Sequence, residues 1–282
     1  MTVAMIGLGN MGSGMCANLV KAEFLVRAFD LDAGAVEQAV KDGAQAAASI
    51  SEAVSGAQVV VTMLPAGKHV HDVFFSEQGI ADSATSGALF LDCSTISVED
   101  ARSAAARSNE RGFEMVDAPV SGGVAAAAGG SLTFMVGGSD VAFKRAKPIL
   151  EAMGKTIVHA GGNGNGQAAK IANNMLLGIS MIATCEAFDL AQKLGLDAQT
   201  FFDISSKASG QNWSMTSYCP APGPVPTAPS NNDYKAGFSV DMMLKDLLLA
   251  KAAAESTAAD ARFGKQAAKI YEDLSAAGQG QK

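Results

Sequence analysis

A glycine-rich turn near the N-terminus restricts the fold more than any other feature of the chain. It follows an apolar run over 3–7, it begins an amphipathic segment, and Asp30 ends the next apolar run. In such a turn the first glycine permits the bend, the second lets the backbone approach a pyrophosphate, and the third lets the helix pack on the strand. An ordinary tight turn does not account for all of these features together. The pattern therefore predicts an NAD site formed by Gly7, Leu8, Gly9, Asn10, Met11 and Gly12.

The residue at the end of the second apolar run favours NAD over NADP. A carboxylate at Asp30 would accept hydrogen bonds from the adenosine ribose and would repel a 2′-phosphate. Asp32 adds a second negative charge, and Arg27 should point to the opposite face because side chains alternate along a strand. A cap for the helix beginning near Ala33 is the alternative role for Asp30.

The hydrophobic pattern predicts an α/β fold in the first half of the chain and a helical second half. Short apolar runs alternate with alanine-rich amphipathic runs, as in a doubly wound parallel sheet covered on both faces. We expect strands over 3–7, 25–30, 59–64, 89–93, 114–117, 133–136 and 157–159. The segment Gly-Gly-Asn-Gly-Asn-Gly after Ala160 ends this pattern. The predicted domains are a Rossmann-type NAD-binding domain over 1–163 and an all-helical substrate and dimerisation domain over 164–282.

The second half should begin with one long helix over 167–194 that joins the domains. It is apolar on most sides, so we expect it to be buried between neighbours. A stretch over 214–237 holds five of the eight prolines, and a loop of this length is usually functional or disordered. Helices over 240–257 and 261–276 should end the chain. A large apolar helical domain suggests a homodimer or a homotetramer.

Lys170 is the first candidate for chemistry. It is the only permanently charged side chain between Lys155 and Glu186, and Asn173 and Asn174 follow at helical spacing. A lysine in apolar surroundings is costly unless it is used or paired, and desolvation would suit it to general acid–base work. The alternative is a lysine whose ammonium group reaches solvent at the domain edge.

Other candidates follow strands. Ser121, Gly122 and Gly123 form a turn whose N–H groups could bind a carboxylate, or simply a flexible turn. Leu64-Pro65 and Ser94-Thr95 lie at the carboxyl ends of strands, where open sheets bind ligands, although any strand exit has this position. The pair Lys245-Asp246 could be a solvated helix edge.

Composition excludes several classes of function. The net charge is −7, only 17% of residues are charged, and the basic residues are scattered, which argues against nucleic acid or membrane as partners. The apolar stretch over 175–185 is too short to span a bilayer. The spacing of the cysteines suits neither zinc nor a secreted disulfide framework, so we expect a cytoplasmic protein with reduced thiols and no metal site; they are Cys16, Cys93, Cys185 and Cys219.

Four motifs together resemble the β-hydroxyacid dehydrogenase family over nearly the whole chain: GLGNMG, DAPVSGG, GNGQAAKIANNMLLGISM and MLKDLLLA. The resemblance implies that Lys170 donates and accepts the catalytic proton and that Asn174 orients the substrate. It also implies that the serine-glycine turn holds the substrate carboxylate and that Lys245 lies by cofactor and substrate. Positions that would touch NAD are Leu64, Pro65 and Thr95.

The proline-rich loop and Trp213 are similar to those of the family members that oxidise 3-hydroxyisobutyrate. This implies reversible, NAD-dependent oxidation of 3-hydroxyisobutyrate to methylmalonate semialdehyde, in valine degradation. One alternative is a reductase of tartronic, succinic or glyoxylic semialdehyde, and another is a catalytically inactive NAD-binding adaptor. Members of the family usually continue with a further tail after the segment that matches the end of this sequence.

Overall fold

The computed structural model describes residues 1–235 and 237–282, and the chain divides into two compact units, Met1–Lys170 and Ile171–Lys282. The division falls inside helix α9 (Asn165–Lys193). The boundary expected near residue 163 lies just before this helix, and it stays a prediction. Position 236 of the proline-rich loop lies outside the described residues.

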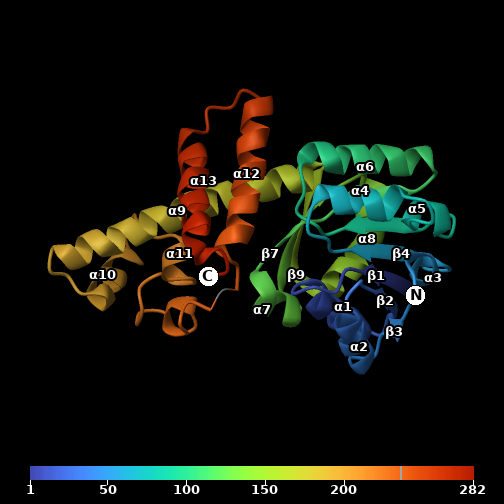
Figure 1. Cartoon of the computed structure of the whole chain (residues 1–282), viewed down its shortest axis with the longest axis horizontal. Coiled ribbons are helices and arrows are strands. Elements are labelled where there is room, and N and C mark those ends of the chain that lie inside the picture. The colour runs from blue at the N-terminus through green and yellow to red at the C-terminus, as the bar shows by residue number, and fades with distance from the viewer. Residues whose placement is uncertain (236) are drawn as a thin grey trace. The chain divides into compact units, whose positions relative to one another are not determined.

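The first unit is built on one nine-stranded sheet (Figure 1). Its strand order is β3-β2-β1-β4-β5-β6-β8-β7, with β9 paired to β8. The strands from β3 to β6 are parallel, β8 runs antiparallel to β6 and β7, and β9 is parallel to β8. The strands are β1 (Thr2–Ile6), β2 (Leu25–Phe29), β3 (Gln45–Ala46), β4 (Val59–Thr62), β5 (Leu89–Asp92), β6 (Glu114–Asp117), β7 (Val120–Ser121), β8 (Leu132–Gly137) and β9 (Gly154–Gly161).

All seven strands expected from the sequence are present, and the α/β fold is confirmed; β6 has the expected bounds, and the ends of the other six are shifted. The expectation of a parallel sheet was wrong at one edge, where β8 is antiparallel to β6 and to β7. Strands β3 and β7 were missed. Each has two residues, which is too short for alternation to identify a strand.

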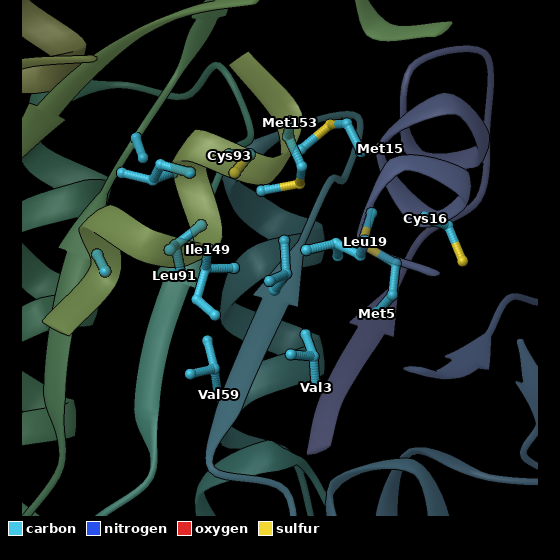
Figure 2. Packing of buried hydrophobic residues seen from close by; sticks show 14 of the residues in the cluster. Val3, Met5, Met15, Cys16, Leu19, Val59, Leu91, Cys93, Ile149 and Met153 are labelled. Atoms are coloured by element: carbon cyan, nitrogen blue, oxygen red, sulfur yellow. The ribbon is translucent and has the colours of Figure 1, made fainter. Parts of the chain in front are cut away.

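Helices cover both faces of this sheet, because alternate residues of each strand face opposite ways. On β1, Val3 and Met5 join one buried cluster, whereas Ala4 and Ile6 join the other. Figure 2 shows the first cluster, in which Met15 and Leu19 of α1 and Ile149 and Met153 of α8 pack against the strands. The helices of this unit are α1 (Gly12–Lys21), α2 (Ala33–Lys41), α3 (Ile50–Val54), α4 (Gly67–Phe75), α5 (Ile80–Ser83), α6 (Val98–Glu110), α7 (Gly123–Ala128) and α8 (Asp140–Met153).

The second unit holds helices joined by turns and loops, and none of its described residues forms a strand. The residues of α9 after Lys170 pack through Leu177, Ile179 and Ile182 on a buried cluster from α12 and α13, and through Phe188 on the residues around Met215. The other elements are α10 (Ala198–Ser205), α11 (Trp213–Thr216), a 3-10 turn (Pro229–Asn231), α12 (Val240–Ser256), α13 (Arg262–Leu274) and a π turn (Ser275–Gln279).

Helix α9 is less buried than its apolar sequence led us to expect. Its most apolar 18-residue window has a mean hydropathy of 1.3, and only 28% of that window is buried. The reason is that core residues of α12 and α13 cover one side of it, while Leu176 and Leu190 are exposed. By length and composition the whole of α9 could also cross a membrane, although the apolar stretch over 175–185 is too short to do so by itself. One such helix is weak evidence, because core helices of soluble proteins pass the same test.

Candidate active site

The turn between β1 and α1 needs its glycines where the sequence has them. Gly7 has φ +95°, and a Cβ there would collide with the Met63 carbonyl. A Cβ on Gly12 would collide with the Gly7 carbonyl oxygen, so this glycine permits the close packing of helix on strand. A Cβ on Gly9 would meet nothing within 4 Å. The backbone at Gly9 is therefore open to a ligand, as a pyrophosphate requires.

Asp30 lies directly behind this turn. Its Oδ2 accepts a hydrogen bond of 2.6 Å from Leu8 N, and its Oδ1 accepts one of 2.8 Å from Asp32 N. The cap of α2 is Asp32, whose Oδ1 accepts from Gly34 N at 2.9 Å, so the alternative role suggested for Asp30 belongs to its neighbour. The guanidinium of Arg27 donates to the Ser55 carbonyl and is engaged away from Asp30.

A hollow of about 290 Å³ opens beside Asp30, at the start of α1 and α2. It contains two carboxylates and no basic side chain among the described residues that line it, which are Leu8, Gly9, Asn10, Ser13, Asp30, Asp32, Ala35 and Gln38. The negative charge of this hollow suits the adenosine end of NAD better than a phosphorylated ribose.

Leu64-Pro65 and Thr95 follow β4 and β5, as expected, and a buried carboxylate stands beneath them. Asp92, the last residue of β5, is fully buried, and its Oδ1 accepts hydrogen bonds from the hydroxyls of Thr62 (2.7 Å) and Ser94 (2.6 Å). Burial raises the pKa of the Asp92 carboxyl to about 6, although the hydrogen bonds from Ser94 and Thr62 lower it. Asp92 Oδ2 has no hydrogen-bond partner among the described residues. Our sequence interpretation did not single out Asp92 or Thr62.

Two glycines in the turn after β7 have backbone angles that other residues rarely adopt. Gly122 has φ +133° and Gly123 has φ +71°, and a Cβ on Gly122 would lie 2.5 Å from the Cβ of Ala126. Ser121 precedes them, half-buried. The conformation of this turn therefore needs glycine at both positions, and N–H groups in such a turn can bind a small anion, so the carboxylate site stays a prediction.

Lys170 is buried, with 6% of its surface exposed, one helical turn after the start of α9. That start is fixed by Asp117, whose carboxylate accepts from Gly164 N at 2.7 Å and from Gln167 N at 3.0 Å. Burial raises the pKa of Asp117, against these backbone hydrogen bonds, which lower it. The expected alternative, a lysine reaching solvent, is wrong.

In the second unit, Asn174 is held by a carboxylate that the sequence led us to place in solvent. Asn174 is 1% exposed, its Nδ2 donates to Asp246 Oδ2 at 2.6 Å, and its Oδ1 accepts from Asn173 at 3.0 Å. Lys245 Nζ lies 3.3 Å from Asp246 Oδ1. Asp246 is 2% exposed, so the expectation of a solvated helix edge was wrong for this residue.

The reason is the position of Asp246 on α12. It lies three residues after Met243 and four before Ala250, both buried, and so falls within the apolar face of the helix. This spacing was the signal that could have revealed it. The two units thus each bring together part of the expected set: Leu8 with Asp30 in the first, and Asn174 with Lys245, through Asp246, in the second.

An open glycine turn backed by an acidic residue, on a doubly wound sheet, is the arrangement of an NAD(P)-binding domain, and the family models identify the class of protein as a dehydrogenase. Residues 2–162 match the family model of the NAD binding domain of 6-phosphogluconate dehydrogenase. Residues 164–282 match the model described as NAD-binding of NADP-dependent 3-hydroxyisobutyrate dehydrogenase. The chain belongs to the 3-hydroxyisobutyrate dehydrogenase family of β-hydroxyacid dehydrogenases.

Relatives match along nearly the whole chain. A probable 3-hydroxyisobutyrate dehydrogenase of Mycobacterium tuberculosis is 49% identical over 98% of this chain and 92% of its own length. An NAD-dependent L-serine dehydrogenase of Pseudomonas aeruginosa is 46% identical over 95% of this chain and 90% of its own. The solved structure of the M. tuberculosis 3-hydroxyisobutyrate dehydrogenase with L-serine is 48% identical, has a TM-score of 0.94, and covers 99% of this chain and 95% of that chain.

Proposed function

We propose that the chain catalyses the reversible, NAD-dependent oxidation of 3-hydroxyisobutyrate to methylmalonate semialdehyde, in valine degradation. The observation that carries the proposal is the burial of Lys170, which is 6% exposed. It lies near the start of α9, the helix that follows the last strand of the dinucleotide-binding sheet. Alcohol oxidation must remove a hydroxyl proton, and a desolvated amine is suited to accept it. Relatives named for this activity, at up to 49% identity, support the substrate.

Each remaining candidate has a role in this proposal. NAD, when bound, accepts the hydride from the alcohol carbon. Lys170 takes the hydroxyl proton, and Asn174, held by Asp246, orients the hydroxyl. The turn of Ser121, Gly122 and Gly123 holds the carboxylate, which fixes the alcohol carbon for transfer. Lys245 lies by cofactor and substrate, and the cofactor is held by the glycine turn, Asp30, Leu64, Pro65 and Thr95.

NAD, and not NADP, is the proposed cofactor. The hollow beside Asp30 holds a second carboxylate, Asp32, and Arg27 is engaged with Ser55. A 2′-phosphate placed there would face two negative charges without a basic partner among the residues that line the hollow.

L-Serine is a second candidate substrate, because one relative is named an L-serine dehydrogenase and a solved relative contains L-serine. Serine and 3-hydroxyisobutyrate share a carboxylate and a primary alcohol and differ only in an ammonium or a methyl group on the carbon between them. The same lysine and carboxylate-binding turn could therefore process both, and the surroundings of that carbon decide the preference.

A substrate panel tests these proposals. The wild-type enzyme is assayed with 3-hydroxyisobutyrate, L-serine, tartronic and succinic semialdehydes, and glyoxylate, each with the NAD and NADP couples, by absorbance of the reduced cofactor. We expect the highest kcat/KM for 3-hydroxyisobutyrate with NAD. A higher value for another substrate would reassign the enzyme within its family. Binding of NADH without turnover of any substrate would instead indicate an adaptor.

The helical unit is proposed to pair with a second copy of the chain, as a homodimer or a homotetramer of a soluble, cytoplasmic enzyme. Large apolar side chains on α9 are exposed, with Leu176 at 64% and Leu190 at 59%. Sedimentation equilibrium tests the pairing. Leu176→Glu with Leu190→Glu should yield monomers, whereas Val141→Glu, at a 60% exposed position of α8, should not. A monomeric wild type would refute it.

A further inference from the structure

A row of buried polar side chains crosses the carboxyl edge of the sheet. Thr62, Asp92 and Asp117 are the last residues of β4, β5 and β6, and they are register partners across these strands. All three are at most 3% exposed. Burying polar groups costs free energy unless hydrogen bonds compensate it, so the row calls for an explanation beyond packing.

The first part of the row fixes the turn after β4. The Ser94 hydroxyl donates to Asp92 Oδ1 at 2.6 Å and accepts from Leu64 N at 2.9 Å. Ser94 is itself fully buried. A hydrogen bond therefore joins the backbone of Leu64, a proposed NAD contact, to the loop that follows β5.

The second part centres on Gln167, which is fully buried in the first turn of α9. Its Nε2 donates to the Ser94 carbonyl at 2.7 Å, and its Oε1 accepts from Ile96 N at 3.1 Å. The side-chain amide therefore bonds the peptide groups on either side of Thr95. The backbone N–H of Gln167 donates to Asp117, so the same residue is fixed at both ends.

Gln167 lies three residues before Lys170, so the two are neighbours on one face of α9. Since Thr95 is a proposed cofactor contact, the amide of Gln167 links the loop that faces the cofactor to the helical turn that carries the proposed general base. A purely structural anchor could bond any buried backbone groups, whereas this one holds the two peptides that flank Thr95.

We propose that Gln167 is a positioning residue for hydride transfer, which sets the place of Lys170 relative to the loop of Thr95. This rests on the proposed function, because Lys170 matters only if it moves the proton. An error of about 1 Å in the position of a catalytic group can cost roughly 100-fold in rate. Loss of the amide should therefore lower kcat more than it lowers cofactor binding or stability.

The test is Gln167→Met, which keeps the length and helix propensity of the side chain but removes both hydrogen bonds. Gln58→Met is the matched control. Gln58 also bonds two backbone groups, accepting from Thr2 N at 2.6 Å and donating to the Gly56 carbonyl at 3.2 Å, but it precedes β4 at the opposite edge of the sheet. We expect kcat to fall ~10- to 100-fold in Gln167→Met, with the Kd for NADH nearly unchanged, and to stay at the wild-type value in Gln58→Met.

Gln167→Glu keeps the test informative if the methionine variant does not fold. A protonated carboxyl still donates to Ser94 and accepts from Ile96, whereas a carboxylate only accepts. The ratio of its kcat to that of the wild type should rise as the pH falls. A ratio that does not change with pH, or equal kcat values in Gln167→Met and Gln58→Met, would overturn the proposal.

A wild type that turns over no substrate would refute the proposed function. Hydrogen exchange would then test separately whether Gln167 links the loop of Thr95 to the first turn of α9. In Gln167→Met, with wild type and Gln58→Met as references, exchange should accelerate in segments 94–97 and 164–170 and nowhere else in the first unit. Unchanged or uniformly faster exchange would refute the link between these segments.

Discussion

Replacing Asp92 with asparagine should stabilise the protein above about pH 6. Asp92 is fully buried, its Oδ2 lacks a hydrogen-bond partner among the described residues, and Asp117 adds repulsion. Together these raise the pKa of the carboxyl from its ordinary value of 3.8 to about 6, because burial outweighs the hydrogen bonds to Oδ1. Asparagine retains an Oδ1 acceptor for Thr62 and Ser94 and carries no charge.

The sign and size of the effect follow from the two pKa values. The folded chain binds this proton more tightly than the unfolded chain, so the contribution of Asp92 to stability is complete below the unfolded value and is lost as pH rises through the folded one. A difference of roughly two units at ~1.36 kcal/mol each gives ~3 kcal/mol as an upper bound. The asparagine NH₂ would occupy the place of Oδ2, also without a partner, which reduces the gain.

Urea unfolding at pH 4 and pH 8 measures this effect. The unfolding free energy of Asp92→Asn minus that of the wild type should grow by up to ~3 kcal/mol from pH 4 to pH 8. Asp72→Asn, which changes an exposed carboxylate on α4, should show no such growth. A difference for Asp92→Asn that is the same at both pH values would refute the reasoning, because it would mean that Asp92 carries no proton-linked penalty in the folded state.

Three further outcomes test the proposed function. Lys170→Ala, and also Lys170→Arg, should leave NADH binding intact but lower kcat by about two to four orders of magnitude, because arginine cannot release its proton; near-native turnover would show that another group is the base. The proline-rich loop is proposed to close over the substrate and exclude water. Replacing 220–233 with a short glycine linker should therefore raise KM for 3-hydroxyisobutyrate and spare NAD binding; an unchanged KM and substrate ranking would refute this proposed role. The kcat/KM ratio should favour NAD over NADP at least about tenfold, and Asp30→Asn with Leu31→Arg should move it toward NADP; a wild type that prefers NADP would contradict the role of Asp30.

The fold was predictable where the sequence pattern is local. The alternation along β1 places Val3 and Met5 on one face of the sheet and Ala4 and Ile6 on the other. The glycine turn predicted a strand before it and a helix after it, and these are β1 and α1. The antiparallel edge at β7 and β8 was not predictable, because strand direction there depends on pairing between distant segments. The partial burial of α9 was also missed, since apolar composition does not say what covers a helix.

The candidate site was predictable as far as motifs reach. The serine-glycine turn is identified by adjacent residues, and Asp30 by its place at the end of the apolar run that follows the glycine turn, so a pattern of known spacing is enough to suggest a role for each. Asp92, Gln167 and Asp246 are different, because their roles depend on contacts between distant segments. Asp92 depends on strand register, Gln167 on the packing of α9 against the loop after β5, and Asp246 on the packing of α12 against α9. In the sequence alone an aspartate at a strand end resembles a loop residue, and only the fold shows that it is buried.

Asp92 and Gln167 meet at Ser94 and should nevertheless respond differently to mutation. Ser94 gives its only hydroxyl proton to Asp92 Oδ1, and its carbonyl accepts from Gln167. A proton on Asp92 would occupy Oδ2, which has no partner in the described chain, so Oδ1 keeps its acceptor role in either charge state. Ionisation of Asp92 therefore changes the free energy of the folded state without reorganising the loop.

Asp92→Asn should alter stability and leave kcat nearly unchanged, whereas Gln167→Met should lower kcat with a smaller effect on stability. If both variants changed stability and turnover in the same proportion, Ser94 would be transmitting a general loosening of this edge of the sheet, and the separate positioning role of Gln167 would be lost.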